Sequence, residues 1–315
     1  MKDLECVAFL QWALPKLNMR WPGFRKVRRQ VCKRISKRLQ ELSISDVSAY
    51  REYLERRPEE WPNLDSLCSI PISRFYRDRG VFDYLRDAIL PGLAEAAVAR
   101  GDRQFRVWSC GCASGEEVYT LAILWQLRIA PRFPNLSLQI TATDIDSTLL
   151  ARCGQGCYTA GSLKDFPREW LDLAFRKTDS LFCIRDQFRR GVEFFKQDVR
   201  QEFPPGQFHL ILCRHVVFTY FDERLQLEIL DRMIDRLLPQ GVLVTGKQEP
   251  LPCAHPRLTL LGLRMGIYQN DALQAQPATD ALFQGASSGR TDHTDEDLPN
   301  ERREKRSFTP HADIA

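Results

Sequence analysis

The apolar positions of the first hundred residues recur at helical spacing. Ser45 is typical of the N-cap of a short helix over 47–55, and the pattern over 79–99 predicts another helix with an interruption at Pro91 and Gly92. No strand pattern precedes Phe105, so we expect an N-terminal helical domain over residues 1–90. The clearest helix is expected over 24–42, where one face carries Phe24, Val27, Val31, Ile35, Leu39 and Leu42.

From Phe105 onward, short apolar runs alternate with helical patterns. Strands are expected at 105–109, 138–143, 192–198, 208–213 and 241–246, helices at 115–128, 147–153 and 223–238, and a closing hairpin at 258–270. This alternation predicts an α/β domain over 91–270 with a parallel, doubly wound sheet. Residues 157–191 break the alternation, so we expect an inserted subdomain with an extra strand at 181–186. The polar tail, 271–315, is expected to be disordered.

Composition and charge narrow the function classes. The start of the chain lacks the basic and apolar regions of an export signal, and no segment is long and apolar enough for a membrane helix, so we expect a cytoplasmic protein without membrane insertion. Because no export signal is found, we expect all ten cysteines to be reduced thiols, and their spacing, without a C-x-x-C pair, predicts no metal site. The net charge of +4 argues against a general polyanion binder, but the segment from Arg20 to Arg38 has nine Lys or Arg and no acid.

A loop of small residues, SCGCASGEE (109–117), joins the first expected strand to a helix. Gly111 and Gly115 let a ligand approach the backbone. Glu116 and Glu117 at the helix N-terminus would repel a pyrophosphate. They suit a ligand that is cationic there, such as S-adenosylmethionine, with its sulfonium and ammonium groups. The alternative is a tight turn that only packs the helix on the strand.

Polar side chains also follow the later strands. Asp144 is placed to accept hydrogen bonds from ribose hydroxyls, with Asp146 as a helix cap, although spacing alone does not separate these roles. Asp198 is a candidate acceptor for the adenine amine, with Val199 as an apolar contact. Beyond the fourth strand, Arg214 and Tyr220 are candidates for an acidic substrate and for the pocket wall. His215 is equally well explained as a structural histidine.

Six segments in order resemble the CheR-type chemotaxis protein-glutamate O-methyltransferases. They are IPISRFYRD (70–78), RVWSCGCASGEEVYTLAI (106–123), ATDID (142–146), VEFFKQD (192–198), CRHVVFTYFD (213–222) and LLPQGVLVTG (237–246). The resemblance implies a Rossmann-like S-adenosylmethionine-dependent methyltransferase domain, an N-terminal helical domain and a small β-subdomain insertion. It also implies methyl transfer to protein glutamate carboxylates.

The resemblance assigns site residues by position. Arg106, Arg214 and Tyr220 are expected to place the substrate carboxylate, and Glu117 is favoured over Glu116 as the acidic cofactor ligand. The expected cofactor-binding residues are Ser73, Arg77, Gly111, Gly115, Glu116, Glu117, Asp144, Asp198, Val199, His215 and Val216.

Three departures from the family pattern affect the expected function. His215 stands where the family has Asn, the segment 213–222 is one residue longer, and residues 246–249 read GKQE instead of GHSE. An acidic, chemoreceptor-like protein is the expected partner, and the basic segment would speed its encounter. A solvated helix face or a contact with RNA would also explain that segment. The remaining alternatives are a regulatory module that binds the cofactor without turnover, and a methyltransferase for RNA or a small molecule.

Overall fold

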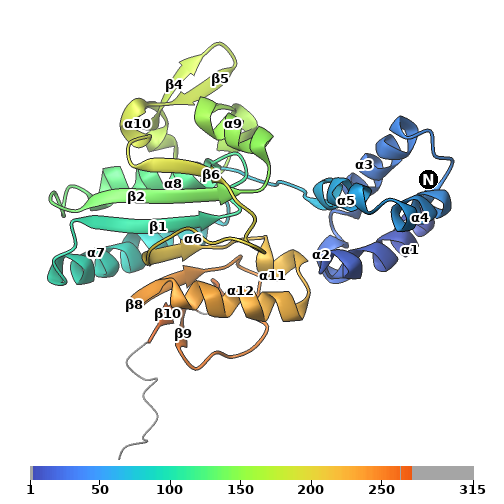
Figure 1. Ribbon diagram of the computed structural model, residues 1–315. Helices are drawn as coiled ribbons and strands as arrows, with labels where there is room; N and C mark the ends of the chain where they lie inside the picture. The colour runs from blue at the N-terminus through green and yellow to red at the C-terminus, as the bar shows by residue number, and fades with distance from the viewer. Residues whose placement is uncertain (1–2, 263, 272–315) are drawn as a thin grey trace, which may run out of the picture. The chain divides into compact units, whose positions relative to one another are not determined.

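The computed structural model describes residues 3–262 and 264–271, and its residues 3–99 form helices and helical turns joined by loops (Figure 1). The helices are α1 (Asp3–Ala13), α2 (Trp21–Phe24), α3 (Arg28–Glu41), α4 (Val47–Arg56), α5 (Trp61–Cys68), α6 (Arg79–Tyr84) and α7 (Leu90–Ala99). Short 3₁₀ turns occupy Leu14–Leu17 and Pro58–Glu60, and a π-helical turn, Leu85–Ile89, joins α6 to α7.

Three local predictions for this region were wrong. The expected helix over 24–42 is divided into α2 and α3, because the chain turns at residues 25–27. Asp46, and not Ser45, caps α4, since its carboxylate accepts from the backbone N–H groups of Ser48 and Ala49. The helix over 79–99 is not interrupted at Pro91. That residue lies in the first turn of α7, where its missing N–H is not needed, and the irregularity comes earlier as the π-helical turn.

The rest of the described chain forms the predicted doubly wound sheet. Its strand order is β6-β2-β1-β7-β8-β10-β9, in which β6, β2, β1, β7 and β8 run parallel and β10 is antiparallel to both neighbours. The strands are β1 (Gln104–Cys110), β2 (Ser137–Asp144), β6 (Val192–Lys196), β7 (Phe208–Leu212), β8 (Leu237–Val244), β9 (Leu258–Gly262) and β10 (Ile267–Asn270). The helices between them are α8 (Glu116–Leu124), α9 (Ser147–Gln155), α11 (Val217–Tyr220) and α12 (Glu223–Asp235), and the π-helical turn Trp125–Ile129 extends α8.

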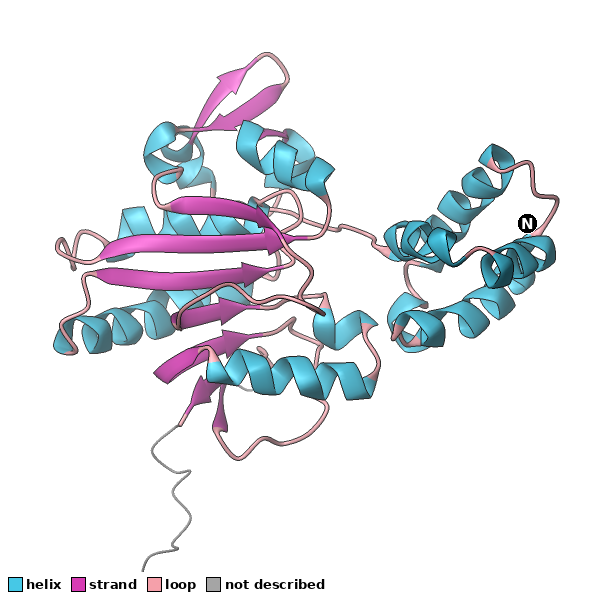
Figure 2. Ribbon diagram, viewed as in Figure 1, coloured by secondary structure: helices cyan, strands magenta, loops and turns pink. Residues whose placement is uncertain are grey.

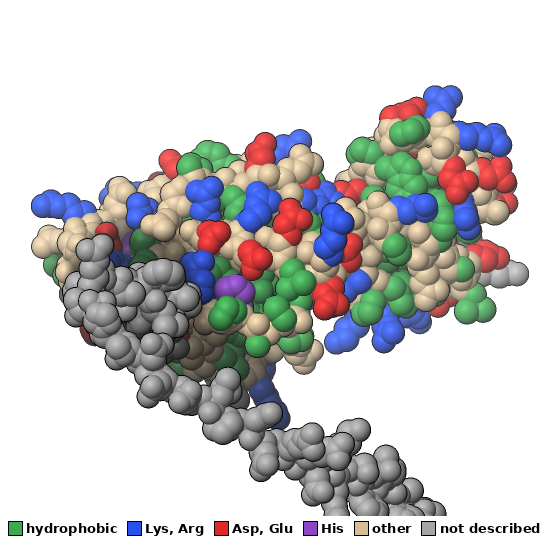
Figure 3. All heavy atoms as spheres, turned by 60° about the horizontal axis from the view of Figure 1, so that its bottom comes forward, with side chains coloured by type: hydrophobic (Ala, Val, Ile, Leu, Met, Phe, Trp, Pro, Cys, Tyr) green, Lys and Arg blue, Asp and Glu red, His purple; other side chains and the backbone are tan. Residues whose placement is uncertain are grey.

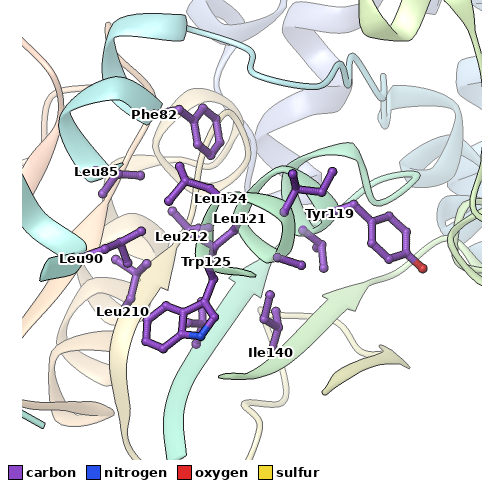
Figure 4. Close-up of a cluster of buried hydrophobic side chains, with 14 of the residues drawn as sticks. Phe82, Leu85, Leu90, Tyr119, Leu121, Leu124, Trp125, Ile140, Leu210 and Leu212 are labelled. Carbon is purple, nitrogen blue, oxygen red and sulfur yellow. The ribbon is translucent and has the colours of Figure 1, made fainter. Parts of the chain in front are cut away.

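Helices cover both faces of the large sheet (Figure 2). Alternating side chains of the central strands enter two apolar cores, one on each face of the sheet. Val107 packs with α6, α7 and α8, whereas the next residue, Trp108, packs with α12. The first core includes Trp125 and Leu210 (Figure 4). Buried side chains of α1, α3, α4 and α5 belong to the second core. The two cores hold β1 and β7 side by side at the centre, where the strand order reverses.

The segment 157–191 forms the expected separate piece, a three-stranded antiparallel sheet in the order β3-β5-β4. Its strands are β3 (Cys157–Thr159), β4 (Phe175–Thr178) and β5 (Leu181–Ile184), and helix α10 (Leu171–Ala174) precedes β4. Only β5 was expected from the sequence. Short 3₁₀ turns lie at Ala160–Leu163, Arg168–Trp170 and Asp186–Phe188.

The prediction that all ten cysteines are reduced was wrong for four of them. Cys157 and Cys183 are directly opposite each other in β3 and β5 and form a disulfide. A second disulfide joins Cys6 of α1 to Cys32 of α3. In both pairs the partners are 26 residues apart in the sequence, so only the folded chain brings them together.

Within the described residues, no helix is long and apolar enough to cross a membrane. The expected disordered tail, 271–315, lies outside the described residues except for Asp271.

Candidate functional site

The loop from Cys110 to Gly115 lies at the carboxyl edge of the sheet, beside the point where the strand order reverses. The N–H groups of Gly111 and Cys112 both donate to Thr143 O, at 2.8 and 3.0 Å, which ties the loop to the end of β2. Gly111 and Gly115 have φ angles of +75° and +87°, a region that glycine adopts without steric cost. In open α/β sheets this edge is where ligands bind.

Asp144 fastens the same loop from the end of β2. Its carboxylate accepts from Ala113 N at 2.8 Å and from Asp146 N at 3.0 Å. Burial raises the pKa of Asp144, and these N–H groups oppose that rise. Asp146 instead caps α9 by accepting from Thr148 N and Leu149 N, as predicted. Of the two carboxylates, Asp144 is therefore the one that faces the loop.

The two glutamates at the start of α8 have different surroundings. Glu116 is 2% exposed and accepts from Ser114 Oγ at 2.9 Å. The Glu117 side chain is 16% exposed and accepts from Ser109 Oγ at 3.1 Å and from Arg214 Nη1 at 2.8 Å. Glu117 is thus the more accessible of the two beside the loop.

Arg214, directly beyond β7, is buried among carboxylates. Its side chain is only 2% exposed and bridges Glu117 to Asp78, whose Oδ2 lies 2.6 Å from Nη2. It also donates to Arg77 O, and its guanidinium lies over the Phe82 ring. From its position after the fourth strand, Arg214 was predicted to orient a substrate carboxylate. In the structure its guanidinium links Arg77 and Asp78, which precede α6, to Glu117 of α8. Little of its surface is exposed to an incoming ligand.

Polar contacts continue from Asp78 to His215 and on to Glu249, two residues in segments that depart from the family pattern. His215 has a φ of +61° and places Nε2 3.1 Å from Asp78 Oδ2. Its backbone N–H donates to Glu249 Oε2 at 2.7 Å. Glu249, which is 5% exposed, also accepts from Gly246 N at 2.5 Å and from the Thr219 hydroxyl. The hydrogen bond from His215 and the charge of Arg214 lower the pKa of Asp78.

Asp78 and Glu249 were missed as network residues, although the sequence held a signal for each. Asp78 directly follows Arg77 in the matched segment 70–78, and Glu249 ends the altered GKQE segment. Asp78 could have been considered because it adjoins a predicted site residue, and Glu249 because it lies in a segment that departs from the family pattern.

The predicted adenine pair follows β6. Asp198 accepts from the backbone N–H and the guanidinium of Arg200, while Val199 is buried. Arg200 was not predicted as a site residue. Next to Asp198, the side-chain oxygen of Gln197 is buried without a hydrogen-bond partner in the described structure.

Ser73 and Arg77 lie in the irregular segment before α6 and are partly buried. Arg77 donates to Ile72 O at 2.5 Å, and no ion pair of its guanidinium is found among the described residues. Burial lowers the pKa of Arg77. Val216 lies against Gly111, since a Cβ on that glycine would be 2.4 Å from Val216 Cγ2.

Arg20, directly before α2, contacts the end of α11, where Tyr220 lies. Arg20 N donates to Tyr220 O at 2.9 Å, and the Arg20 guanidinium donates to the carbonyls of Phe218 and Thr219. These contacts cover the C-terminal carbonyls of α11. Burial raises the pKa of the Tyr220 phenol, which lies near the charges of Arg77 and Glu249.

The structure does not bring Arg106 to this edge. Arg106 precedes the last residue of β1 by four positions, about 13 Å along a strand. Its backbone N–H donates to His209 Nδ1, near the opposite end of β7. Its position on β1 therefore separates Arg106 from the other predicted residues.

Comparison with known proteins gives one family match and several similar chains. Residues 72–267 match the family model described as CheR methyltransferase, SAM binding domain. A chemotaxis protein methyltransferase from Escherichia coli is 29% identical over 245 residues, covering 75% of this chain and 81% of that protein. One from Borreliella burgdorferi is 28% identical over 224 residues, covering 69% and 78%.

Two further similarities cover less of the compared protein. An uncharacterised 104.1 kDa protein from Rhodobacter capsulatus is 30% identical over 79% of this chain, but the chain spans only 26% of its length. A solved N-methyltransferase from Bradyrhizobium japonicum, in complex with S-adenosyl-L-homocysteine, is 16% identical. That match covers 51% of this chain and 61% of the other, with a TM-score of 0.28.

Proposed function

This chain belongs to the CheR methyltransferase family, and from that premise we propose that it methylates glutamate carboxylates of an acidic protein with S-adenosylmethionine as the methyl donor. One observation carries the proposal. The carboxylates of Glu117 and Asp144 flank the same glycine loop at the carboxyl edge of the sheet, beside the strand-order reversal.

The residues present fit the cofactor. Asp144 retains acceptor capacity for ribose hydroxyls, and Arg77, whose guanidinium forms no ion pair within the described part of the chain, suits the cofactor's carboxylate. Glu117 offers negative charge to its ammonium group. Bound S-adenosylmethionine supplies an electrophilic methyl group on a sulfonium. The protein's contribution is to align the acceptor with that group and to exclude water.

A glutamate acceptor needs no general base, because its ordinary pKa of about 4.3 leaves it anionic at neutral pH. The site agrees with this requirement. His215 has Nε2 3.1 Å from Asp78 and Nδ1 4.0 Å from Glu249, so both of its ring nitrogens face carboxylates. Its imidazole is therefore held within the protein's own network and is not directed at an acceptor. Tyr220, at the end of α11, is the predicted substrate residue that remains beside the site.

The basic segment now divides into two sets of side chains. Arg28, Arg34 and Arg38 contact Asp3, Ser69 O and Glu60 and hold the helical domain together. A second set is exposed: Arg29, Lys33 and Lys37 recur at steps of four along one side of α3, and Arg25 and Lys26 lie just before that helix. We call this second set the basic stripe.

The basic stripe supports an acidic partner. Over the face drawn in Figure 3, acidic and basic side chains are interspersed. The basic stripe is therefore a better guide to the charge of a partner than the net charge of +4. A row of exposed cations attracts an acidic helical surface and speeds its encounter. We propose that the stripe meets the segment that carries the acceptor glutamates.

The test is methyl transfer from labelled S-adenosylmethionine to an acidic helical receptor fragment, followed by mild alkali. A glutamate methyl ester releases its label as methanol, and replacing the acceptor glutamates by glutamine should abolish labelling. A base-stable product would indicate RNA or a small molecule as the acceptor. Tight binding of S-adenosylhomocysteine without any transfer would indicate a regulatory module.

Asp144→Asn and Asp146→Asn form a matched pair for the cofactor site. Asp144→Asn should weaken S-adenosylhomocysteine binding at least tenfold, because it removes a charged acceptor beside the loop. Asp146→Asn should bind normally, since asparagine is an equally good helix cap. Equal affinities in calorimetry would contradict the assignment of Asp144.

A further inference from the structure

Arg200 lies between two carboxylates that are far apart in the sequence. Its guanidinium donates to Asp198 through Nε at 2.9 Å and Nη2 at 2.8 Å, and to Asp65 through Nη1 at 3.1 Å and Nη2 at 2.6 Å. Asp198 follows β6, whereas Asp65 belongs to α5, 135 residues from Arg200. One side chain therefore joins the N-terminal helical domain to the predicted adenine residue.

The three side chains are largely withdrawn from solvent, with 19% exposure for Arg200 and 16% for each aspartate. The guanidinium also lies 5.7 Å from the ring centre of Phe221, just beyond α11. Contacts that use the planar fork of arginine fix direction as well as distance. Arg200 is thus held by three separate parts of the chain.

These contacts also determine which acceptor positions of the Asp198 carboxylate remain free. A carboxylate has about four acceptor positions. Oδ1 accepts from Arg200 N and Oδ2 accepts from Nη2, while the single N–H of Nε is shared between Oδ1 at 2.9 Å and Oδ2 at 3.0 Å. Oδ2 retains an acceptor position, in an orientation that Arg200 sets.

We propose that Arg200 is a positioning residue for cofactor recognition: braced by Asp65, it holds the Asp198 carboxylate in the orientation that accepts the exocyclic amine of adenine. This inference rests on the proposed function, in which Asp198 contacts adenine. Through Asp65, the helical domain would then help to recognise the nucleobase, in addition to its proposed contact with the protein substrate.

The experiment compares two ligands by calorimetry on the full chain: S-adenosylhomocysteine and S-inosylhomocysteine, in which a carbonyl replaces the amine. The wild-type protein should prefer the adenine ligand. Arg200→Gln should weaken adenine-ligand binding about tenfold and leave inosine-ligand binding nearly unchanged, so that the preference falls. Asp65→Asn should act in the same direction by about threefold, and Arg200→Lys should lie between Arg200→Gln and the wild type.

Two matched controls separate positioning from general damage. Arg232→Gln removes an arginine from α12 that donates to Gln201 O in the same loop and, in the described structure, forms no hydrogen bond or ion pair with Asp198. Asp235→Asn removes an exposed aspartate that pairs with Arg257. Both should retain the wild-type preference.

The outcomes distinguish this inference from the function on which it rests. Equal weakening of both ligands by Arg200→Gln and Asp65→Asn would mean a merely structural role and overturn the proposal. Normal affinity and preference in both variants would also overturn it. If the wild-type protein binds both ligands equally, recognition of the adenine amine is refuted, while cofactor binding itself is not. A wild-type protein that binds neither ligand would refute the proposed function itself.

Discussion

Gly111 lies against Val216, so closely that a Cβ on the glycine would be 2.4 Å from Val216 Cγ2. The contact joins the loop after β1 to the segment after β7, the two sides of the strand-order reversal. Gly111 also has a φ of +75°. Both the close approach and the backbone conformation therefore require a residue without a side chain.

Gly111→Ala should lower the free energy of unfolding by about 2–4 kcal/mol, from left-handed backbone strain and overpacking. Because the loop must move, S-adenosylhomocysteine affinity should fall at least tenfold. Gly154→Ala is the matched control, since a Cβ there meets nothing within 4 Å in α9. The control should gain up to about 1 kcal/mol. Wild-type affinity in Gly111→Ala, measured by calorimetry, would contradict the close approach.

Arg214→Met should destabilise the protein by roughly 3 kcal/mol at pH 7, because Glu117 and Asp78 lose a buried charge partner. Urea unfolding measures the effect. Arg214→Lys, which keeps the charge but loses the fork, should lie between the variant and the wild type. Arg132→Met is the control, since Arg132 and its partner Glu95 are 53% and 62% exposed, and it should change stability by less than about 0.5 kcal/mol. A similar small effect of Arg214→Met would exclude the bridging role.

Asp78 should contribute stability that is lost in acid. Its folded-state pKa is depressed below the unfolded value of about 3.9, so the unfolded chain binds more protons as the pH falls. The contribution is therefore present at neutral pH and declines below about pH 4. In urea titrations, the stability difference between the wild type and Asp78→Asn should be the same at pH 7 and pH 5 and smaller at pH 3.5. A difference that stays constant over this range would show that the ionised carboxylate is not responsible.

The basic stripe should affect the encounter with substrate and leave the cofactor site unchanged. The double variant Arg29→Glu with Lys33→Glu should slow association with an acidic receptor fragment about tenfold at low salt, and the loss should diminish as salt screens the charges. Its S-adenosylhomocysteine affinity should stay at the wild-type value. Stopped-flow association measures the first effect and calorimetry the second.

The control for the stripe is the double variant Arg56→Glu with Arg132→Glu, which reverses two exposed cations elsewhere. It changes the net charge by the same amount. If both double variants slow association equally, net charge and not the stripe governs the encounter.

The amino-acid sequence by itself determined the features that depend on neighbouring residues. The alternation of strand and helix patterns after Phe105 predicted the parallel sheet, because periods of two and 3.6 residues reflect which face of an element is buried. Glycines before acids located the loop at the start of α8, and Asp146 was foreseen as a helix cap. Each signal lies within a few residues of the structure it specifies.

Only the tertiary structure decided which distant side chains meet. Cys157 pairs with Cys183, Arg214 is enclosed by Asp78 and Glu117, and Arg200 reaches Asp65. These partners are separated by 26 to 136 residues, and their contacts depend on strand register and on how the helical domain packs. The charge of a side chain can be read from the sequence, but the partner that charge meets is set by the packing of the whole chain.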